Sequence, residues 1–188
     1  MPSGPPRSRR RSLPPEPLDR TSHLAIDPTG VTVTEFEFAV WRFSAAFVRW
    51  QGDCMSCATP AGLSGQDAAI LHVIRMRDWP KSLSEIARLL NRDDVANIQY
   101  SLKKLLTAGM IEKAHASSKK QTSYTVSAVG AGVTAAYSEH RRNILLAMIE
   151  QLHDPANDIA QATRTLDLLI GIYDQASRIA ATYRLPED

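Results

Sequence analysis

The sequence predicts a mainly α-helical protein that carries one small β-hairpin. Most of the chain after residue 30 repeats apolar residues at helical intervals of three and four. Two short segments, residues 110–116 and 122–127, instead alternate apolar and polar residues, as half-buried strands do. With 188 residues and an apolar fraction of 44%, the chain is long enough for one ordinary domain with a sizeable core.

The first 30 residues have a different composition from the rest. They contain seven of the 11 prolines, and residues 1–20 hold five arginines against two acids, whereas the net charge of the whole chain is only +2. Such a segment buries too little apolar surface to offset the entropy of ordering it. We expect a flexible basic arm over residues 1–30, which either contacts phosphate or stays a solvated tail.

A long first helix is predicted from Thr34, which forms a capping-box pattern with Glu37. Apolar residues follow on two of its faces, so it is expected to lie at a subunit interface or to pack on both faces within one chain. The glycine and proline of "GDCMSCATPAG", residues 52–62, break the pattern.

Three shorter helices follow in the centre of the chain. Ser64 with Asp67 and Ser82 with Glu85 form capping boxes that start the first two. The turn "NRDD" leads into the third, where Asp93 or Asp94 is expected to accept from the free first-turn amides and Gly109 to end the helix. Its apolar stripe predicts one core-facing side, made of Val95, Ile98, Leu102 and Leu105.

The last 60 residues predict two more helices. One runs from Val129 to Leu152 and is ended by Pro155. The other carries an apolar seam at alternating steps of three and four, as in packed antiparallel or coiled helices: Ile159, Ala162, Leu166, Leu169, Tyr173, Ala176 and Ala180. Long helices at both ends of a small central unit predict that these ends pack together between two chains.

The central order of a short helix, a tight turn, an amphipathic helix and a hairpin predicts a winged helix-turn-helix. Its second helix fits the major groove, and the hairpin, tipped by "SSKKQ", reaches toward phosphates or the minor groove. With flanking helices, residues 34–183 resemble the MarR family of bacterial transcription regulators. The segments that carry this resemblance are "LSEIARLL", "DDVANIQYSLKKLLTAGMIEK" and "YTVSAVG".

The resemblance implies three segments after the arm, and a set of partners. Residues 31–60 form an N-terminal dimerisation helix, residues 61–128 the DNA-binding domain and residues 129–188 the C-terminal dimerisation helices. The expected protein is a homodimeric repressor, cytoplasmic and nucleoid-associated, that binds a pseudo-palindromic double-stranded DNA operator. One departure is the wing, where "ASSKKQTS" lacks the usual arginine and its acidic partner. We therefore expect the wing to contribute mainly backbone affinity.

The candidate DNA-binding residues lie on the polar side of the recognition helix and at the wing tip. Amides suit base edges, and lysines and hydroxyls suit phosphates. The alternative is a plain solvated helix face. The candidates are Asn97, Gln99, Tyr100, Ser101, Lys103, Lys104, Ser118, Lys119, Lys120 and Gln121.

The resemblance also implies a small-molecule effector, an aromatic acid or phenol, bound between the dimerisation helices and the DNA-binding lobe. A cationic side chain there would pair with a carboxylate, and an aromatic ring would stack. The candidates are Trp41, Arg42, His72, Arg75 and Arg141, although such residues also serve as core or solvated side chains. The run "VANIQYSLKKLL" resembles the branch that regulates aromatic and nicotinate catabolism.

Cys54 and Cys57 are the only cysteines. Nothing nearby completes a zinc site, so they are either a thiol redox sensor or two ordinary reduced thiols. No catalytic motif is present, and we expect neither an enzyme, nor a cofactor, nor a metal. We also expect neither a membrane span nor a signal peptide. A further alternative is a winged-helix module that binds a protein instead of DNA.

Overall fold

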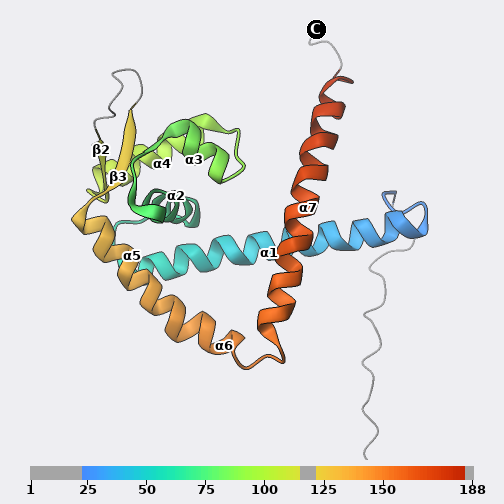
Figure 1. Ribbon diagram of the computed structural model, residues 1–188, viewed down its shortest axis with the longest axis horizontal. Coiled ribbons are helices and arrows are strands. Elements are labelled where there is room, and N and C mark those ends of the chain that lie inside the picture. Colours follow the sequence, from blue (N-terminus) through green and yellow to red (C-terminus); the bar gives the residue numbers. More distant parts are fainter. Residues whose placement is uncertain (1–22, 115–121, 185–188) are drawn as a thin grey trace, which may run out of the picture.

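The computed structural model describes residues 23–114 and 122–184 (Figure 1). Helices dominate the described part, and one small sheet accompanies them, so the predicted fold class is confirmed. In chain order the elements are α1 Pro28–Ala58, α2 Gly65–Arg75, η1 Met76–Asp78, β1 Lys81–Ser82, α3 Leu83–Leu89, α4 Val95–Thr107, β2 Ile111–Ala114, β3 Ser123–Val126, α5 Ala128–His140, η2 Arg141–Leu146, α6 Ala147–Ile149 and α7 Pro155–Ala181.

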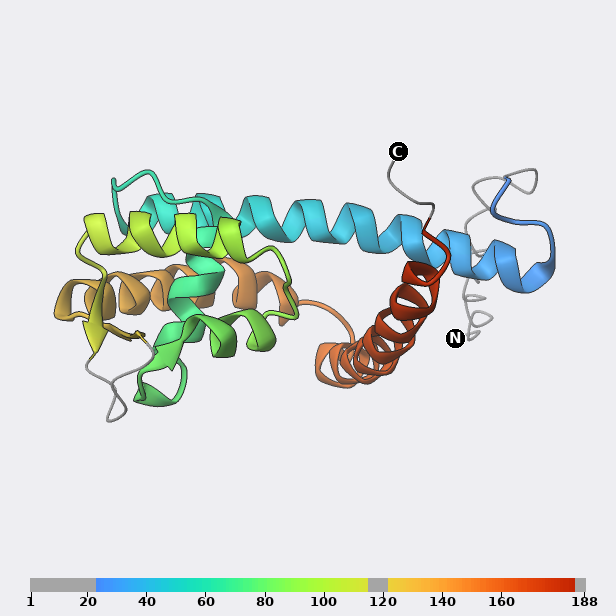
Figure 2. The same ribbon diagram turned by 90° about the horizontal axis from the view of Figure 1, so that it is seen from above.

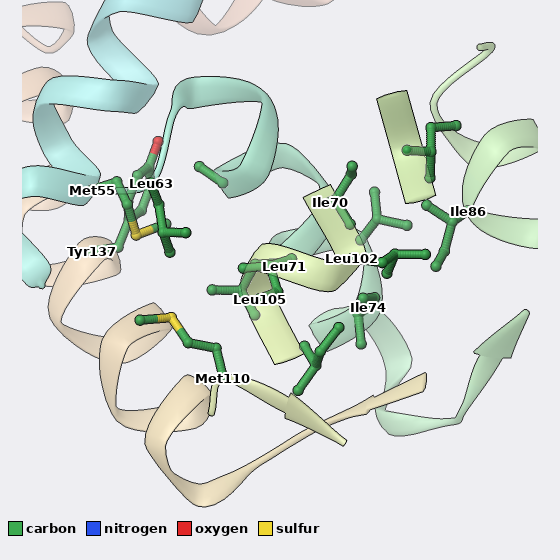
Figure 3. Close-up of a cluster of buried hydrophobic side chains, with 14 of the residues drawn as sticks. Met55, Leu63, Ile70, Leu71, Ile74, Ile86, Leu102, Leu105, Met110 and Tyr137 are labelled. Carbon is green, nitrogen blue, oxygen red and sulfur yellow. The ribbon is translucent and has the colours of Figure 1, made fainter. Parts of the chain in front are cut away.

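The elements from α2 to β3 form a lobe at one end of the molecule, on one side of the C-terminal part of α1 and of α5 (Figure 1). Its core is one cluster of buried side chains from α1, α2, α3, α4, β2 and α5 (Figure 3). The rest of α1 extends away from this lobe. In both views α7 crosses this extended part of α1 (Figures 1 and 2). The lobe is therefore the packed unit, while α1 and α7 project from it.

Helix α1 is longer at both ends than the sequence predicted. Asp27 is its N-cap and accepts from the backbone N of Gly30 at 2.8 Å, so the capping box predicted at Thr34 is wrong. The predicted break at residue 52 is also wrong, because the helix continues to Ala58. A glycine inside a helix costs only about 1 kcal/mol, and the burial of Met55 in the core offsets that cost.

Both capping boxes of the central helices are confirmed. Asp67 N donates to Ser64 Oγ at 3.2 Å, and Ser64 N donates back to Asp67 Oδ2 at 2.8 Å. The equivalent bonds at Ser82 are 3.3 and 2.8 Å. At α4 the expected cap is absent in the described structure: Asp94 occupies the N-cap position, but no side chain caps the helix there.

The sheet has three antiparallel strands in the order β1-β3-β2. The hairpin of β2 and β3 follows the predicted segments, with Ile111 opposite Val126. Strand β1, only two residues long, was not predicted, because so short a strand shows no alternation. Gly109 follows the end of α4 and has φ +68°, the left-handed conformation that was expected of it. The wing tip, residues 115–121, lies outside the described residues.

The C-terminal half differs from the prediction in its boundaries. The predicted helix over residues 129–152 is divided into α5, a π-helical segment η2 and α6, which ends at Ile149. Pro155, predicted to end that helix, is the first residue of α7, where a proline lacks no needed hydrogen bond. Among the described helices, none has the length and hydrophobicity to cross a bilayer.

Candidate nucleic-acid interface and ligand pocket

Helix α4 has one buried and one exposed face. Ile98, Leu102 and Leu105 are at most 2% exposed, as predicted, whereas Val95 is exposed at the start of the helix. The opposite side carries a set of exposed polar residues: Asn97, Gln99, Tyr100 and Lys103. This exposed polar face of α4 has the side chains that base edges and phosphates require.

Two of the predicted DNA-binding residues on α4 instead face Asp67 in α2. Ser101 is only 6% exposed, and Lys104 Nζ lies 2.5 Å from Asp67 Oδ2. Burial opposes ionisation of Asp67, but hydrogen bonds from Lys104, Ser101 and Ser64 outweigh it and lower the pKa of the carboxyl. Ser101 is therefore not on the exposed face, and most of the charge of Lys104 is compensated within the protein.

The turn before α4 contains a residue that the sequence analysis did not single out, Arg92. Arg92 donates two hydrogen bonds to Asp94, and Asn97 donates a third to the same carboxylate. The only sequence signal for this arrangement is an arginine two residues before an acidic N-cap. Arg92 thus lies beside the predicted base-reading residue Asn97.

Only part of the wing belongs to the described residues, so few of its candidate DNA-binding side chains can be placed. Lys113 in β2 is exposed. The four predicted DNA-binding residues of the tip lie outside the described residues: Ser118, Lys119, Lys120 and Gln121.

A groove of about 450 Å³ adjoins the exposed face of α4. It lies between Tyr100, Lys103 and Thr107 of α4 and the loop after α1, which contributes Ala61 and Leu63. No sequence pattern indicated this groove, because the loop is more than 35 positions away from α4 along the chain. The loop and the exposed polar face of α4 therefore border the same groove.

A larger pocket of about 590 Å³ lies between α1, α2, α5 and η2. Phe47, Trp50 and Gln51 of α1 line one side of this pocket. Three of the predicted effector-binding residues meet in it: His72, Arg75 and Arg141. The pocket therefore combines aromatic walls with cationic groups, which suits a flat anionic ligand.

The other two predicted effector-binding residues lie elsewhere. Trp41 lines a separate pocket of about 290 Å³ with Leu24, Phe36 and Tyr173 among others. Arg42 donates from Nε to the carbonyl oxygen of Phe38, one turn earlier in α1, at 3.4 Å. Both precede the part of α1 that borders the larger pocket, so the structure does not group them with His72.

His72 is the most buried of the three predicted effector-binding residues in the larger pocket. Its Nε2 is buried and has no hydrogen-bond partner among the described residues. Its ring lies edge-on to that of Tyr137, with 4.3 Å between the centroids. Burial, and secondarily the charge of Arg141, lowers the pKa of His72, so the imidazole is neutral at pH 7. The positive charge of the pocket therefore comes from Arg75 and Arg141.

The two cysteines lie on the last turns of α1. Cys54 is buried and donates from Sγ to the carbonyl oxygen of Tyr137 at 3.6 Å, while Cys57 is exposed. Burial, reinforced by neighbouring Cys57, raises the pKa of the Cys54 thiol. A thiol of raised pKa is a poor nucleophile, so the geometry gives no support to Cys54 as a peroxide-reactive thiolate.

Comparisons with known proteins agree with this geometry. Residues 63–130 match the family model of a winged helix DNA-binding domain. No curated protein sequence matches the chain. The structure is similar to that of a mutant MarR from E. coli complexed with operator DNA, at 14% identity and a TM-score of 0.59, over 73% of this chain and 95% of that one.

Two further solved structures are similar to the same extent. One is a MarR family transcription regulator, at 15% identity and a TM-score of 0.59, over 80% of this chain and 99% of that one. The other is the transcriptional regulator BldR from Sulfolobus solfataricus, at 18% identity and a TM-score of 0.57, over 74% of this chain and 95% of that one. Residues 63–130 therefore match a winged helix DNA-binding domain, and the chain has the fold of the MarR-family transcription regulators.

Proposed function

We propose that the protein is a homodimeric transcription repressor of the MarR type, cytoplasmic and nucleoid-associated in bacteria. The observation that carries this proposal is the exposed polar face of α4 in a winged helix domain. In such a dimer the two α4 helices enter successive major grooves of a pseudo-palindromic operator, with half-sites about one helical turn apart. Asn97 and Gln99 contact base edges, and Tyr100 and Lys103 contact the backbone.

The wing is proposed to add affinity without sequence preference. Lys119 and Lys120 at its tip neutralise phosphates, flanked by Ser118 and Gln121. Lysine is a point charge and lacks the planar fork with which arginine recognises a narrow minor groove.

Apolar surface on the projecting helices supports the dimer. In α1, Phe43 is 64% exposed and Phe47 47% exposed, although both are large aromatic side chains. In α7 a stripe at helical spacing is equally open, with Leu168 66%, Ile172 53% and Ile179 51% exposed. Patches of this kind mark protein interfaces, and a second copy of the chain covers them in the proposed assembly.

The pocket between α1, α2 and α5 is proposed to bind the effector, a small aromatic acid or phenol. The two arginines, Arg75 and Arg141, pair with its carboxylate or phenolate, and the neutral His72 offers a hydrogen bond to it. Because the pocket lies between a projecting helix and the lobe, a ligand there favours one orientation of the lobe. DNA affinity then falls when the two α4 helices no longer match the groove spacing. The regulated genes are proposed to serve aromatic or nicotinate catabolism.

Selection of bound duplexes from a random library, followed by fluorescence anisotropy, tests the proposal. We expect an enriched palindrome whose half-sites are about one helical turn apart. The variant Asn97→Ala/Gln99→Ala/Lys103→Ala should lose this preference and remain a dimer by light scattering. The matched control is Asn143→Ala/Gln161→Ala/Arg164→Ala, which removes exposed polar residues and one positive charge away from α4 and the wing. Equal binding by both triple variants would reject α4 as the reading helix, and no enrichment would reject DNA binding itself.

A further inference from the structure

Three polar side chains at the start of α4 form one hydrogen-bonded group, which we call the Asp94 cluster: Arg92, Asp94 and Asn97. Arg92 donates from Nε to Asp94 Oδ1 at 2.7 Å and from Nη2 to Oδ2 at 2.5 Å. Asn97 donates from Nδ2 to the same Oδ2 at 3.1 Å. A single carboxylate thus orients both a guanidinium and an amide.

The carboxylate of this cluster stays ionised under all ordinary conditions. Hydrogen bonds from Arg92 and then Asn97 hold the pKa of Asp94 at about 2. The pairing with Arg92 is bidentate, and both groups are planar, so the direction of the guanidinium is fixed as well as its distance. Partial burial adds to this restraint, since only 19% of the Arg92 side chain is exposed.

Within the described part of the chain, the cluster leaves several hydrogen-bonding groups without a partner. A guanidinium has five N–H donors, and the pair with Asp94 uses one on Nε and one on Nη2. The remaining donors, on Nη1 and Nη2, form the outer end of the fork. Two such donors match O6 and N7 of guanine in the major groove. Asn97 likewise keeps its Oδ1 and one N–H for a neighbouring base.

The position of the cluster matches this chemistry. Residues at the N-terminal end of a recognition helix are those that approach base edges most closely. Asp94 is the N-cap of α4, and Asn97 lies on its first turn. An aspartate at this place repels phosphates, so it is unfavourable for general DNA affinity unless it serves another purpose.

We propose that Asp94 is a specificity-determining positioning residue, which holds Arg92 and Asn97 as one preassembled unit that reads a guanine and its neighbour in each half-site. This inference rests on the proposed function, in which α4 enters the major groove. A fixed fork loses less conformational freedom on binding than a free arginine does. Because Asp94 holds the guanidinium of Arg92, the guanidinium is not free to pair with phosphates. Its hydrogen bonds therefore contribute to sequence preference instead of to non-specific affinity.

The test compares two substitutions that remove the same charge. Asp94→Asn removes the carboxylate that holds the cluster, and Asp93→Asn removes the exposed carboxylate one position earlier. Affinity is measured by anisotropy for the duplex selected by the wild-type protein, for versions with each guanine replaced by adenine, and for an unrelated duplex. We expect the wild type and Asp93→Asn to lose roughly tenfold or more at one guanine per half-site. Asp94→Asn should lose less than roughly threefold there and bind the unrelated duplex at least as tightly.

A second substitution keeps the inference testable if Asp94→Asn does not fold. Arg92→Lys retains the positive charge but not the fork, and it should lose the same guanine preference. Equal discrimination by Asp94→Asn and Asp93→Asn, or full discrimination by Arg92→Lys, would overturn the inference. Failure of the proposed function gives a different result, because the wild type itself would then prefer no duplex.

Discussion

The ammonium of Lys104 in α4 lies 2.5 Å from the carboxylate of Asp67 in α2, and the side chain of Asp67 is only 2% exposed. The same carboxylate accepts from Ser64 at the start of α2 and from Ser101 in α4. One buried carboxylate therefore both completes the capping box of α2 and attaches α4 to it. The orientation of the exposed polar face of α4 depends on this attachment.

Replacing Asp67 should lower the stability of the lobe more than any surface carboxylate does. Asp67→Ala removes the acidic half of the α2 capping box and leaves Lys104 and Ser101 without their buried partner, so we expect a loss of roughly 2–4 kcal/mol in the free energy of unfolding. Urea denaturation followed by circular dichroism measures it. Asp53→Ala, at an exposed position of α1, is the control and should change stability by less than about 0.5 kcal/mol. Equal losses would show that the Asp67 contacts contribute nothing specific.

The same carboxylate predicts a direction for the pH dependence of stability. The pKa of Asp67 is lower in the folded protein than its usual value of 3.8. The unfolded chain therefore binds this proton more readily, and the stabilisation is complete above pH 3.8 and is lost as the pH falls below it. Unfolding measured from pH 6 to pH 3 should show a smaller decline for Asp67→Asn than for the wild type, since the asparagine does not titrate. An identical decline would exclude Asp67 as a source of acid sensitivity.

Lys103 and Lys104 are adjacent lysines that should differ in their contribution to DNA binding. Lys103 is exposed, whereas Lys104 is paired with Asp67. Lys103→Ala should make the slope of log affinity against log salt shallower by roughly 0.9, the value for one phosphate contact. Lys104→Ala should leave that slope within roughly 0.3 and instead reduce stability. Anisotropy titrations at several salt concentrations measure the slopes, and a larger change for Lys104→Ala would contradict the inward role assigned to it.

The parts of this structure that the sequence predicted depend on short intervals. The capping boxes at Ser64 and Ser82 join residues three positions apart, so the pattern alone specifies the contact. The pairing of Asp67 with Lys104 spans 37 positions and depends on how two helices are rotated about their axes. Local patterns therefore predicted the winged helix, but not which lysine of α4 is exposed.

The residues that line the candidate pocket were likewise only partly predicted from the sequence. The resemblance implied five effector-binding residues, and the structure brings together only His72, Arg75 and Arg141. Trp41 and Arg42 lie more than a helical turn before Phe47, the first residue of α1 to reach the pocket, and a helix that extends beyond the lobe cannot be recognised from its periodicity. The length and direction of α1 determine which of its residues reach the pocket, and both depend on tertiary packing.

The pocket should bind simple aromatic carboxylates through its two arginines. We expect isothermal titration calorimetry to detect benzoate binding to the wild type, and Arg141→Ala to weaken it roughly tenfold by removal of one charge-assisted pair. Arg42→Ala is the matched control, because it removes the same charge from α1 outside the pocket. Benzoate at saturating concentration should also release the selected duplex from the wild type. Equal weakening by both substitutions would place the anion elsewhere.

The open stripe on α7 should be required for dimerisation. Leu168 and Ile172 are neighbours one turn apart, and both are more than half exposed in the single chain. Burying them against a second copy removes apolar surface from water, whereas a charge there would have to be desolvated without a partner. We therefore expect Leu168→Glu/Ile172→Glu to be monomeric by multi-angle light scattering at concentrations where the wild type is dimeric. Gln161→Glu/Gln175→Glu adds the same charge at polar positions of α7. If the first variant is still a dimer, the stripe is not part of the interface. If it is a monomer that circular dichroism shows to be folded, it should bind a single half-site weakly and lose the spacing preference of the full operator.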